Sequence, residues 1–271
     1  MQNHLHIALL QPNLIWEDVP ANLAHYDQLL DALPTMQTDL VVLPEMFQSG
    51  FTMNPHLVAE PPNGTTTQWM QTWAKRLDAA ICGSIVTIQN NNYYNRLLWV
   101  MPNGEVHFYD KHHLFRMGRE NETYTRGNTP PLLVQYKGWN ICGLVCYDLR
   151  FPVWSRNHSN PIPEANTQLP TYDLLLYVAN WPQIRSHVWN TLLQARAIEN
   201  LCFVAGCNRV GIDANNIYHS GDSAIIDFKG QTLVTQTDHA AVLQYTLSKT
   251  QLVQFRHDFP AWMDADKFEL R

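Results

Sequence analysis

Apolar residues in this chain follow two spacings, one typical of buried strands and one typical of helices. Continuous apolar runs bounded by Gly, Pro, Asn or Asp indicate strands that are covered on both faces. Strands are predicted over 4–10, 40–43, 80–88, 93–101, 106–109, 132–136, 140–145, 173–179, 201–206 and 240–245, with a further hairpin over 223–230.

Helices are predicted where apolar side chains recur every three or four residues. The segments with this spacing are 21–33, 66–79 and 186–200. Helices and strands alternate, but several strands are joined by tight turns, which indicates mixed sheets. We therefore expect an α/β protein in which two mixed sheets pack together with helices outside, a four-layer α-β-β-α sandwich.

The chain shows no internal boundary. No linker, low-complexity tract or change of composition divides it, so residues 1–271 are predicted to form a single domain. Residues 157–166 break the regular pattern because they are rich in Pro and Asn and poor in apolar side chains. We expect an exposed loop there.

The composition is that of a globular protein. Hydrophobic residues make up 45% of the chain and charged residues 15%, which excludes a disordered protein. The net charge of -6 and the lack of Lys or Arg runs argue against a nucleic-acid partner. The N-terminus lacks the features of a signal peptide, and no segment approaches the roughly 18 apolar residues of a membrane span. A cytoplasmic protein without a membrane partner is predicted.

Five cysteines, an odd number with no Cys-x-x-Cys pair, indicate reduced thiols, most of them in the core. Cys146 differs because polar residues and a proline follow it directly, which places its thiol at a strand end. Two other predicted strands end in the same way, one just before Glu45 and one just before Lys111. A carboxylate, an amine and a thiol at three strand ends are the parts of a nucleophilic catalyst.

At these residues the chain resembles the nitrilase superfamily, the carbon–nitrogen hydrolases that use Glu, Lys and Cys. The resemblance covers nearly the whole length and rests on four blocks, 43–45, 109–115, 146–152 and 220–230. Finer features are similar to the omega-amidase branch, and within it to bacterial 2-oxoglutaramate amidases. These features lie at 44–51, 113–117, 179–182, 195–200 and 206–211. Against this pattern, 157–170 is an insertion.

The resemblance implies a nitrilase-like sandwich and hydrolysis through a thioester, without a metal or an organic cofactor. Cys146 would be the nucleophile, Glu45 the general base, and Lys111 the cation that stabilises the oxyanion. Glu120 matches the family's second glutamate and would hold Lys111 or the substrate amide in place. Glu122 is a close alternative for that position.

The omega-amidase resemblance also implies a substrate that carries a terminal amide and a 2-oxo acid, such as 2-oxoglutaramate or 2-oxosuccinamate. The substrate carboxylate requires a cation, and Arg185 is the candidate because arginine is the usual bidentate partner. Phe47, Phe51 and Trp181 are predicted as apolar walls. The backbone N–H of Tyr147 would be a second donor to the oxyanion.

Other side chains fit structural roles. Arg150, Arg196 and Glu199 are predicted as buried or interfacial ion-pair partners, and Trp69 and Trp73 as core residues. A zinc site at the neighbouring histidines 112 and 113 is disfavoured, because no His-x-x-x-His or Cys-x-x-Cys spacing accompanies them.

The superfamily resemblance implies a homodimer, and the apolar regions around Ala179 and Trp189 are predicted to serve that contact. Two alternatives to an omega-amidase stay open at this point. The first keeps the chemistry but uses a nitrile, an N-carbamoyl compound or another small amide. The second is a redox or binding protein whose Cys146 is a sensor thiol.

Overall fold

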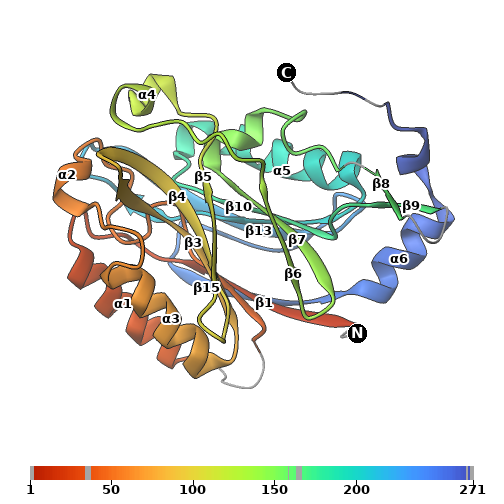
Figure 1. Ribbon diagram of the computed structural model, residues 1–271, viewed down its shortest axis with the longest axis horizontal. Coiled ribbons are helices and arrows are strands. Elements are labelled where there is room, and N and C mark those ends of the chain that lie inside the picture. Colours follow the sequence, from red (N-terminus) through yellow and green to blue (C-terminus); the bar gives the residue numbers. More distant parts are fainter. Residues whose placement is uncertain (1–2, 34–37, 158, 163–166, 267, 269–271) are drawn as a thin grey trace.

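Two mixed β-sheets pack face to face in the computed structural model (Figure 1). The first sheet has the strand order β15 (Ala241–Ser248), β1 (His4–Gln11), β2 (Leu40–Val42), β3 (Ala80–Gln89), β4 (Asn92–Val100) and β5 (Val106–Asp110). The second has the order β12 (Val210–Ile212), β13 (Tyr218–Ile226), β11 (Phe203–Cys207), β10 (Leu174–Val178), β7 (Trp139–Val145) and β6 (Leu132–Tyr136), and β14 (Thr232–Thr237) pairs with β13. The structure describes residues 3–33, 38–157, 159–162, 167–266 and 268.

Helices cover the outer faces of both sheets. The helices are α1 (Val19–Asp31), α2 (Pro55–Val58), α3 (Thr65–Leu77), α4 (Glu120–Thr123), α5 (Ser186–Asn200) and α6 (Lys249–Asp258). Single 3₁₀ turns occur at η1 (Arg116–Gly118), η2 (Cys146–Arg150), η3 (Gln183–Arg185) and η4 (Ala261–Asp264). Figure 1 shows α1 and α3 side by side against the first sheet and α5 against the second. The predicted four-layer sandwich is confirmed.

Alternate side chains of β1 divide between two cores. Leu5, Ile7 and Leu9 lie between the sheets, whereas Ala8 and Leu10 pack with residues of α1 and α3. This alternation has the period of two that a strand requires when both of its faces are covered. All five side chains are at most 1% exposed, and burial of each large one contributes about 1.5–3 kcal/mol.

Parallel strands position the loops that matter for function. In the first sheet β1, β2 and β3 run parallel, and in the second β7, β10 and β11 do. The carboxyl ends of parallel strands share one edge of a sheet, so the segments that follow β2, β7 and β10 come together there. Glu45 follows β2 and Asn180 follows β10, and the two residues are hydrogen-bonded.

The prediction of a loop over 157–166 is wrong in part. A hairpin forms there, because β8 (Ser159–Ile162) pairs antiparallel with β9 (Thr167–Pro170). Asn157 is buried, and its amide donates to the backbone oxygens of Tyr172 and Asn200. Residues 158 and 163–166 of the predicted loop lie outside the described residues.

Ala179 and Trp189, which centre the apolar regions predicted for a dimer contact, lie inside the protomer, and the contact itself stays a prediction. Ala179 and Trp189 are both 0% exposed, and the Trp189 indole donates to the backbone oxygen of Asp222.

The predicted pair of Arg196 with Glu199 is confirmed at 3.0 Å. Trp69 and Trp73 pack in or against the core below the first sheet, as predicted.

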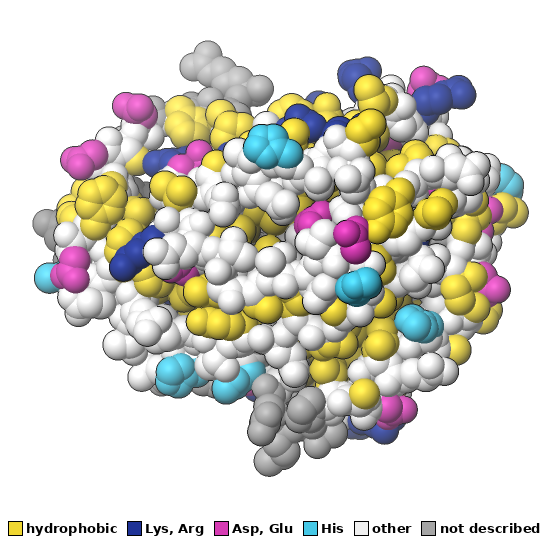
Figure 2. Space-filling model, turned by 180° about the vertical axis from the view of Figure 1, so that it is seen from behind, with side chains coloured by type: hydrophobic (Ala, Val, Ile, Leu, Met, Phe, Trp, Pro, Cys, Tyr) yellow, Lys and Arg dark blue, Asp and Glu magenta, His cyan; other side chains and the backbone are white. Residues whose placement is uncertain are grey.

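Charged side chains are spread over the surface. On the face shown in Figure 2, Lys and Arg side chains are scattered among neutral and acidic ones, with apolar side chains between them. Among the described residues, no helix is both long and apolar enough to cross a bilayer.

A buried histidine makes the stability of the fold depend on pH. His219 in β13 is 3% exposed, and burial, with the nearby charge of Arg209, lowers its pKa to about 4. In the unfolded chain its pKa is about 6.5. Below pH 6.5 the unfolded state therefore binds the extra proton, and the free energy of unfolding falls as the pH drops toward 4.

We expect this histidine to cost the wild type about 2 kcal/mol of stability between pH 7 and pH 5. Urea unfolding of the wild type and of His219→Gln at both pH values measures the effect. The variant is expected to lose less stability than the wild type over this interval. Equal losses in the two proteins would contradict the assignment to His219.

Candidate active site

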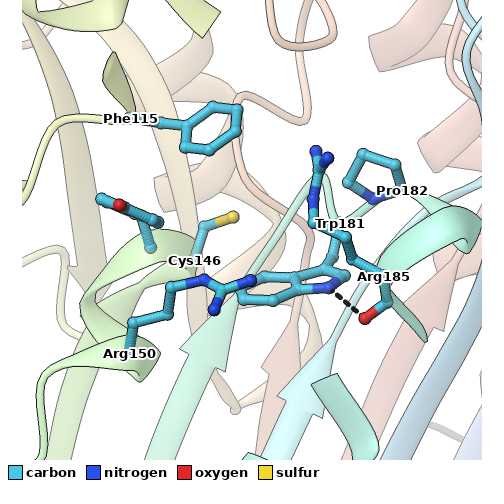
Figure 3. Close-up of a pocket in the computed structure, with 7 residues that line it drawn as sticks. Phe115, Cys146, Arg150, Trp181, Pro182 and Arg185 are labelled. Carbon is cyan, nitrogen blue, oxygen red and sulfur yellow. Dashed lines mark hydrogen bonds between the residues drawn. The ribbon is translucent and has the colours of Figure 1, made fainter. Parts of the chain in front are cut away.

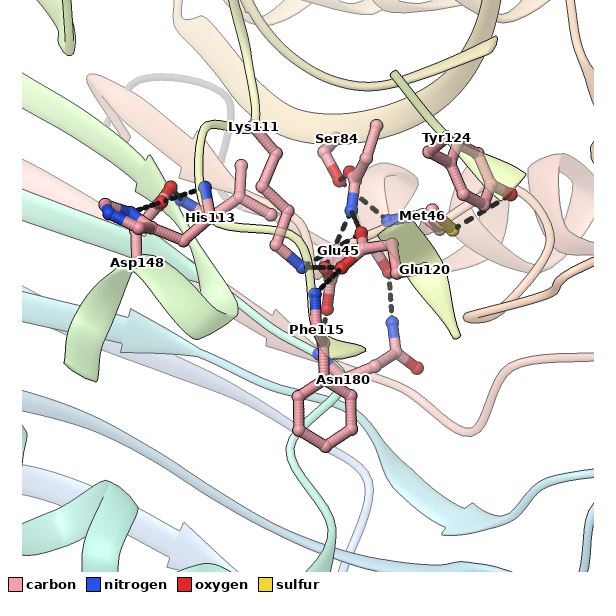
Figure 4. A network of polar contacts seen from close by, with 12 residues as sticks. Glu45, Met46, Ser84, Lys111, His113, Phe115, Glu120, Tyr124, Asp148 and Asn180 are labelled. Atoms are coloured by element: carbon pink, nitrogen blue, oxygen red, sulfur yellow. Dashed lines mark hydrogen bonds and ion pairs between the residues drawn. The ribbon is translucent and has the colours of Figure 1, made fainter. Parts of the chain in front are cut away.

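Three strand ends meet at one edge of the sandwich. Glu45 follows β2, Lys111 follows β5, and Cys146 follows β7 of the opposite sheet. Their side chains are buried, with residue exposures of 0%, 1% and 8%. Figure 4 shows Glu45 and Lys111 at the centre of a dense network of polar contacts. The structure thus brings together the three groups that the strand-end pattern singled out.

Lys111 is bound by two carboxylates. Its Nζ donates to Glu45 Oε1 at 2.8 Å and to the two oxygens of Glu120 at 3.0 and 2.9 Å. Burial alone would lower the pKa of Lys111, but the negative charges of Glu120 and Glu45 outweigh it and raise this pKa above its usual value. The amine is therefore a permanent cation at neutral pH.

Two asparagines that the sequence analysis did not assign hold Glu45. Asn95 in β4 donates from Nδ2 to Glu45 at 2.8 Å and to Glu120 at 3.0 Å. The backbone N–H of Asn180 donates to Glu45 Oε2 at 2.9 Å, and the Asn180 amide donates to the Glu45 backbone oxygen. Asn95 is itself fixed by Ser84, whose hydroxyl donates to it at 2.8 Å.

Glu120, and not Glu122, faces the site. Glu120 is 0% exposed and accepts from the backbone N–H of Phe115 at 2.6 Å. Burial and the charge of Glu45 raise the pKa of Glu120, while Lys111 opposes the shift. Glu122 is exposed and pairs with Arg119 at 2.8 Å on the surface.

Cys146 begins η2 in the left-handed region, with a φ of 45°. Non-glycine residues adopt this conformation only where the surrounding structure holds them in it. The Glu45 side chain and the backbone of Asn180 lie close enough to the thiol to affect its pKa. Burial and the charge of Glu45 raise the pKa of the Cys146 thiol well above its usual value, against the effect of Lys111. The resting thiol is therefore protonated, and it needs a base beside it in order to react.

The thiol opens into a small pocket (Figure 3) with about 290 Å³ of empty space. Its lining residues are Phe115, Cys146, Tyr147, Arg150, Trp181, Pro182 and Arg185. Tyr147, Trp181 and Arg185 of the predicted substrate-binding set therefore line the pocket.

Arg150 lines the pocket, and among the described residues it forms no ion pair, so the prediction of a buried ion pair within the protomer is wrong. Its guanidinium lies over the ring of Trp181, at 5.3 Å from the centroid. Arg185 lies over the ring of Phe115 at 5.3 Å. Figure 3 shows the Arg150 guanidinium at the Trp181 indole and the Arg185 guanidinium apart from it, between Phe115 and Pro182. Among the described residues, neither arginine has a carboxylate within ion-pair distance, in contrast to Arg96, which pairs with Asp110 at 2.7 Å.

Two predicted apolar walls have other positions. Phe47 is 0% exposed and packs on Tyr26 and Trp69, at 5.4 and 5.9 Å between ring centroids, on the outer side of the first sheet. The prediction that Phe47 lines the pocket is therefore wrong. Phe51 lies beside Lys111 instead, with its ring 5.3 Å from Nζ.

The structure gives no support for a metal site. Among the described residues, no group of three His, Cys, Asp or Glu side chains is arranged to hold a metal ion. His112 stacks on Trp154 with 3.9 Å between ring centroids, and His113 stacks on Phe151 with 3.7 Å. The two histidines therefore pack around the loop that carries Lys111.

This fold and this combination of a thiol, an ammonium and two carboxylates define a hydrolase built around a buried cysteine. The chain belongs to the carbon–nitrogen hydrolase family, whose model matches residues 6–256. It is therefore a hydrolase that acts on carbon–nitrogen bonds, and the family predicted from the sequence is confirmed.

Known relatives cover the whole chain. It is 47% identical to Omega-amidase YafV of Escherichia coli (strain K12) over 267 residues, and this matched region covers 98% of each chain. It is 31% identical over 232 residues to 2-oxoglutaramate amidase of Bacillus subtilis (strain 168), covering 84% of this chain and 85% of that protein. The crystal structure of XC1258 from Xanthomonas campestris, a CN-hydrolase superfamily protein with an arsenic adduct in its active site, has a TM-score of 0.94 and 46% identity over 100% of both chains.

Proposed function

We propose that the protein is an omega-amidase. It hydrolyses the terminal amide of a 2-oxo dicarboxylic acid monoamide, such as 2-oxoglutaramate or 2-oxosuccinamate, to the 2-oxo acid and ammonia. The observation that carries this proposal is the pair of guanidinium groups, Arg150 and Arg185, that line the pocket above the Cys146 thiol. The names of the relatives in Escherichia coli and Bacillus subtilis support the same activity.

In the first half of the reaction, Cys146 Sγ attacks the amide carbon while Glu45 takes the thiol proton. A concerted transfer suits a resting thiol that is protonated and lies close to the Glu45 carboxylate. The carbonyl oxygen becomes an oxyanion, which Lys111 Nζ and the backbone N–H of Tyr147 stabilise. The loss of one such donor typically costs about 10² to 10³ in rate.

In the second half, the proton held by Glu45 passes to the leaving nitrogen, the C–N bond breaks, and ammonia departs. The acyl group remains on Cys146 as a thioester. Glu45 then takes a proton from a water molecule, whose oxygen attacks the thioester carbon. The C–S bond breaks, the proton returns to the sulfur, and the 2-oxo acid leaves. Glu120 and Asn95 hold Lys111 and Glu45 in place throughout.

The two arginines bind the other end of the substrate. A guanidinium binds a carboxylate through two parallel hydrogen bonds, and two guanidinium groups without carboxylate partners attract an anion strongly. The flat faces of Trp181 and Phe115 lie beneath them and suit the planar 2-oxo acid. A small pocket with two cations therefore selects a short acid with an amide at its far end.

Ammonia release from a substrate panel tests the activity. The panel contains 2-oxoglutaramate, 2-oxosuccinamate, glutamine, a simple nitrile and an N-carbamoyl amino acid. We expect the highest kcat/KM with the two 2-oxo acid amides. Activity confined to the nitrile or to the carbamoyl compound would overturn the proposed substrate class and leave the family membership standing.

Arg185→Ala and Arg150→Ala are each expected to lower kcat/KM for 2-oxoglutaramate about 10- to 100-fold, mainly through KM. A hydrogen bond to a charged group contributes about 1.5–3 kcal/mol, which corresponds to this range. Turnover of butyramide, which has no carboxylate, is expected to change little in either variant.

Arg119→Ala is the matched control, because Arg119 is exposed, pairs with Glu122 and does not line the pocket. Its kinetics with 2-oxoglutaramate are expected to equal those of the wild type. An unchanged KM in both pocket variants would disprove the role of the arginines in substrate binding.

A further inference from the structure

We propose that Asp148 is a positioning residue that fixes the nucleophile Cys146 relative to the cation Lys111. The proposal rests on the function proposed above, because it concerns the geometry of that reaction. Asp148 is 0% exposed and does not line the pocket, so it does not touch the substrate. It acts through the residues to which it is bound.

The Asp148 carboxylate accepts four hydrogen bonds. Oδ2 accepts from the backbone N–H of Val145 at 3.1 Å and from the Tyr109 hydroxyl at 2.9 Å. Oδ1 accepts from the backbone N–H of His113 at 3.0 Å and from His113 Nδ1 at 2.7 Å. An ionised carboxylate offers about four acceptor sites and no donor, so its capacity is filled and His113 must donate from Nδ1.

The residues that donate to Asp148 lie next to Cys146 and on both sides of Lys111 in the sequence. Val145 immediately precedes Cys146, at the end of β7 in the second sheet. Tyr109 and His113 stand two positions before and two positions after Lys111, at the end of β5 in the first sheet. One buried carboxylate therefore ties the nucleophile of one sheet to the cation of the other.

The conformation of Cys146 requires such a restraint. Its φ of 45° is unfavourable for a residue with a side chain, and it persists only where the surroundings fix it. Asp148 lies in the same turn, two residues later, and its bond to Val145 N closes that turn. The bond therefore sets the direction in which the thiol leaves the strand.

The donors are in turn held by a second ring of contacts. The indole of Trp154 donates to the Tyr109 hydroxyl at 3.0 Å. The imidazole of His113 stacks on Phe151, the residue that directly follows η2, at 3.7 Å between centroids and 9° between planes. These contacts leave Asp148 and its donors little freedom to adjust, so the loss of one bond is transmitted to Cys146 and Lys111.

The test compares two buried carboxylates that bind opposite ends of β7. Asp148→Asn keeps the shape of the side chain but replaces an acceptor oxygen by a donor NH₂ that faces other donors. Asp173→Asn is the matched control, because Asp173 accepts from the backbone N–H of Asn140 at 2.9 Å, pairs with Arg256 at 3.0 Å, and lies away from the pocket.

We expect Asp148→Asn to lower kcat for 2-oxoglutaramate about 100-fold with KM within a factor of about two, because a displacement of about 1 Å can have this effect. Asp173→Asn is expected to lower the unfolding midpoint in urea while the folded protein retains its kcat. Equal kcat losses in the two variants, or a rise in KM at unchanged kcat in Asp148→Asn, would overturn the proposal.

Two further measurements keep the test decisive. Tyr109→Phe is the substitute test if Asp148→Asn does not fold. It removes one of the four donors to Asp148 and is expected to lower kcat about 10-fold. Acrylamide addition to Cys146, followed by mass spectrometry, uses the same thiol and base without the proposed substrate. Slower addition in Asp148→Asn than in Asp173→Asn supports the positioning role even if the wild type does not hydrolyse 2-oxoglutaramate, and equal rates would contradict it.

Discussion

Cys146→Ala is expected to abolish ammonia release, with a loss of about 10⁶ in kcat, the order seen when a covalent nucleophile is removed. Glu45→Gln preserves the size of the side chain but removes the base, and a comparable loss is expected. Because the two groups act in the same step, the double variant should be no slower than Cys146→Ala alone. Steady-state rates of the three variants with 2-oxoglutaramate measure this non-additivity.

Cys142→Ala is the control for this comparison. Cys142 is also a buried thiol of β7, at 4% exposure, and it lies outside the pocket. Its variant is expected to retain kcat and to lose only the stability that a small core truncation costs. The thioester route would be ruled out if Cys146→Ala retained measurable turnover and the double variant with Glu45→Gln were slower still.

Lys111→Met is expected to lose both activity and stability. Removal of the amine leaves Glu45 and Glu120 buried side by side without a counter-charge, and breaking a buried ion pair costs about 3–5 kcal/mol. The loss in the free energy of unfolding should be several-fold larger for Lys111→Met than for Lys137→Met. Lys137 is more exposed than Lys111, and such partly exposed pairs are typically worth about 1 kcal/mol or less.

The stability that Lys111→Met loses is expected to depend on pH. Burial raises the pKa of Glu120 in the folded state, and without Lys111 only the hydrogen bonds from Phe115 and Asn95 oppose that shift. The folded variant then binds a proton that the unfolded chain releases above about pH 4.5, so its stability falls as the pH rises. Urea unfolding should show a larger difference between wild type and Lys111→Met at pH 8 than at pH 5. A difference that does not grow with pH would exclude the unpaired carboxylates as the cause.

The main elements of the fold could be predicted because their apolar patterns are strong. The helix over 66–79 and the strands over 40–43 and 140–145 correspond to α3, β2 and β7 within a few residues. Helix α6 was missed because Leu252 is its only buried side chain among ten residues, so it has almost no apolar face. The hairpin of β8 and β9 was missed because its Pro- and Asn-rich sequence is typical of loops.

The site could be predicted where function depends on the position of a strand end. Glu45, Lys111 and Cys146 have that property, whereas Asn95 lies inside β4, and only the pairing of Asn95 with Val86 of β3 directs its amide toward Glu45. Phe47 was misplaced because its ring packs on Tyr26 and Trp69, contacts between segments that are distant in the sequence. A homodimer, a cytoplasmic location and a single-domain organisation stay predictions from the sequence.

The protonation of the Cys146 thiol also affects how this side chain reacts with oxidants. Peroxide reacts with thiolates and scarcely with thiols, and redox-sensing cysteines are therefore acidic and accessible. Cys146 lacks this acidity because burial and the charge of Glu45 raise its pKa, although its sulfur opens into the pocket. The sulfur therefore depends on Glu45 for its reactivity, and peroxide that enters the pocket is expected to react with it only slowly.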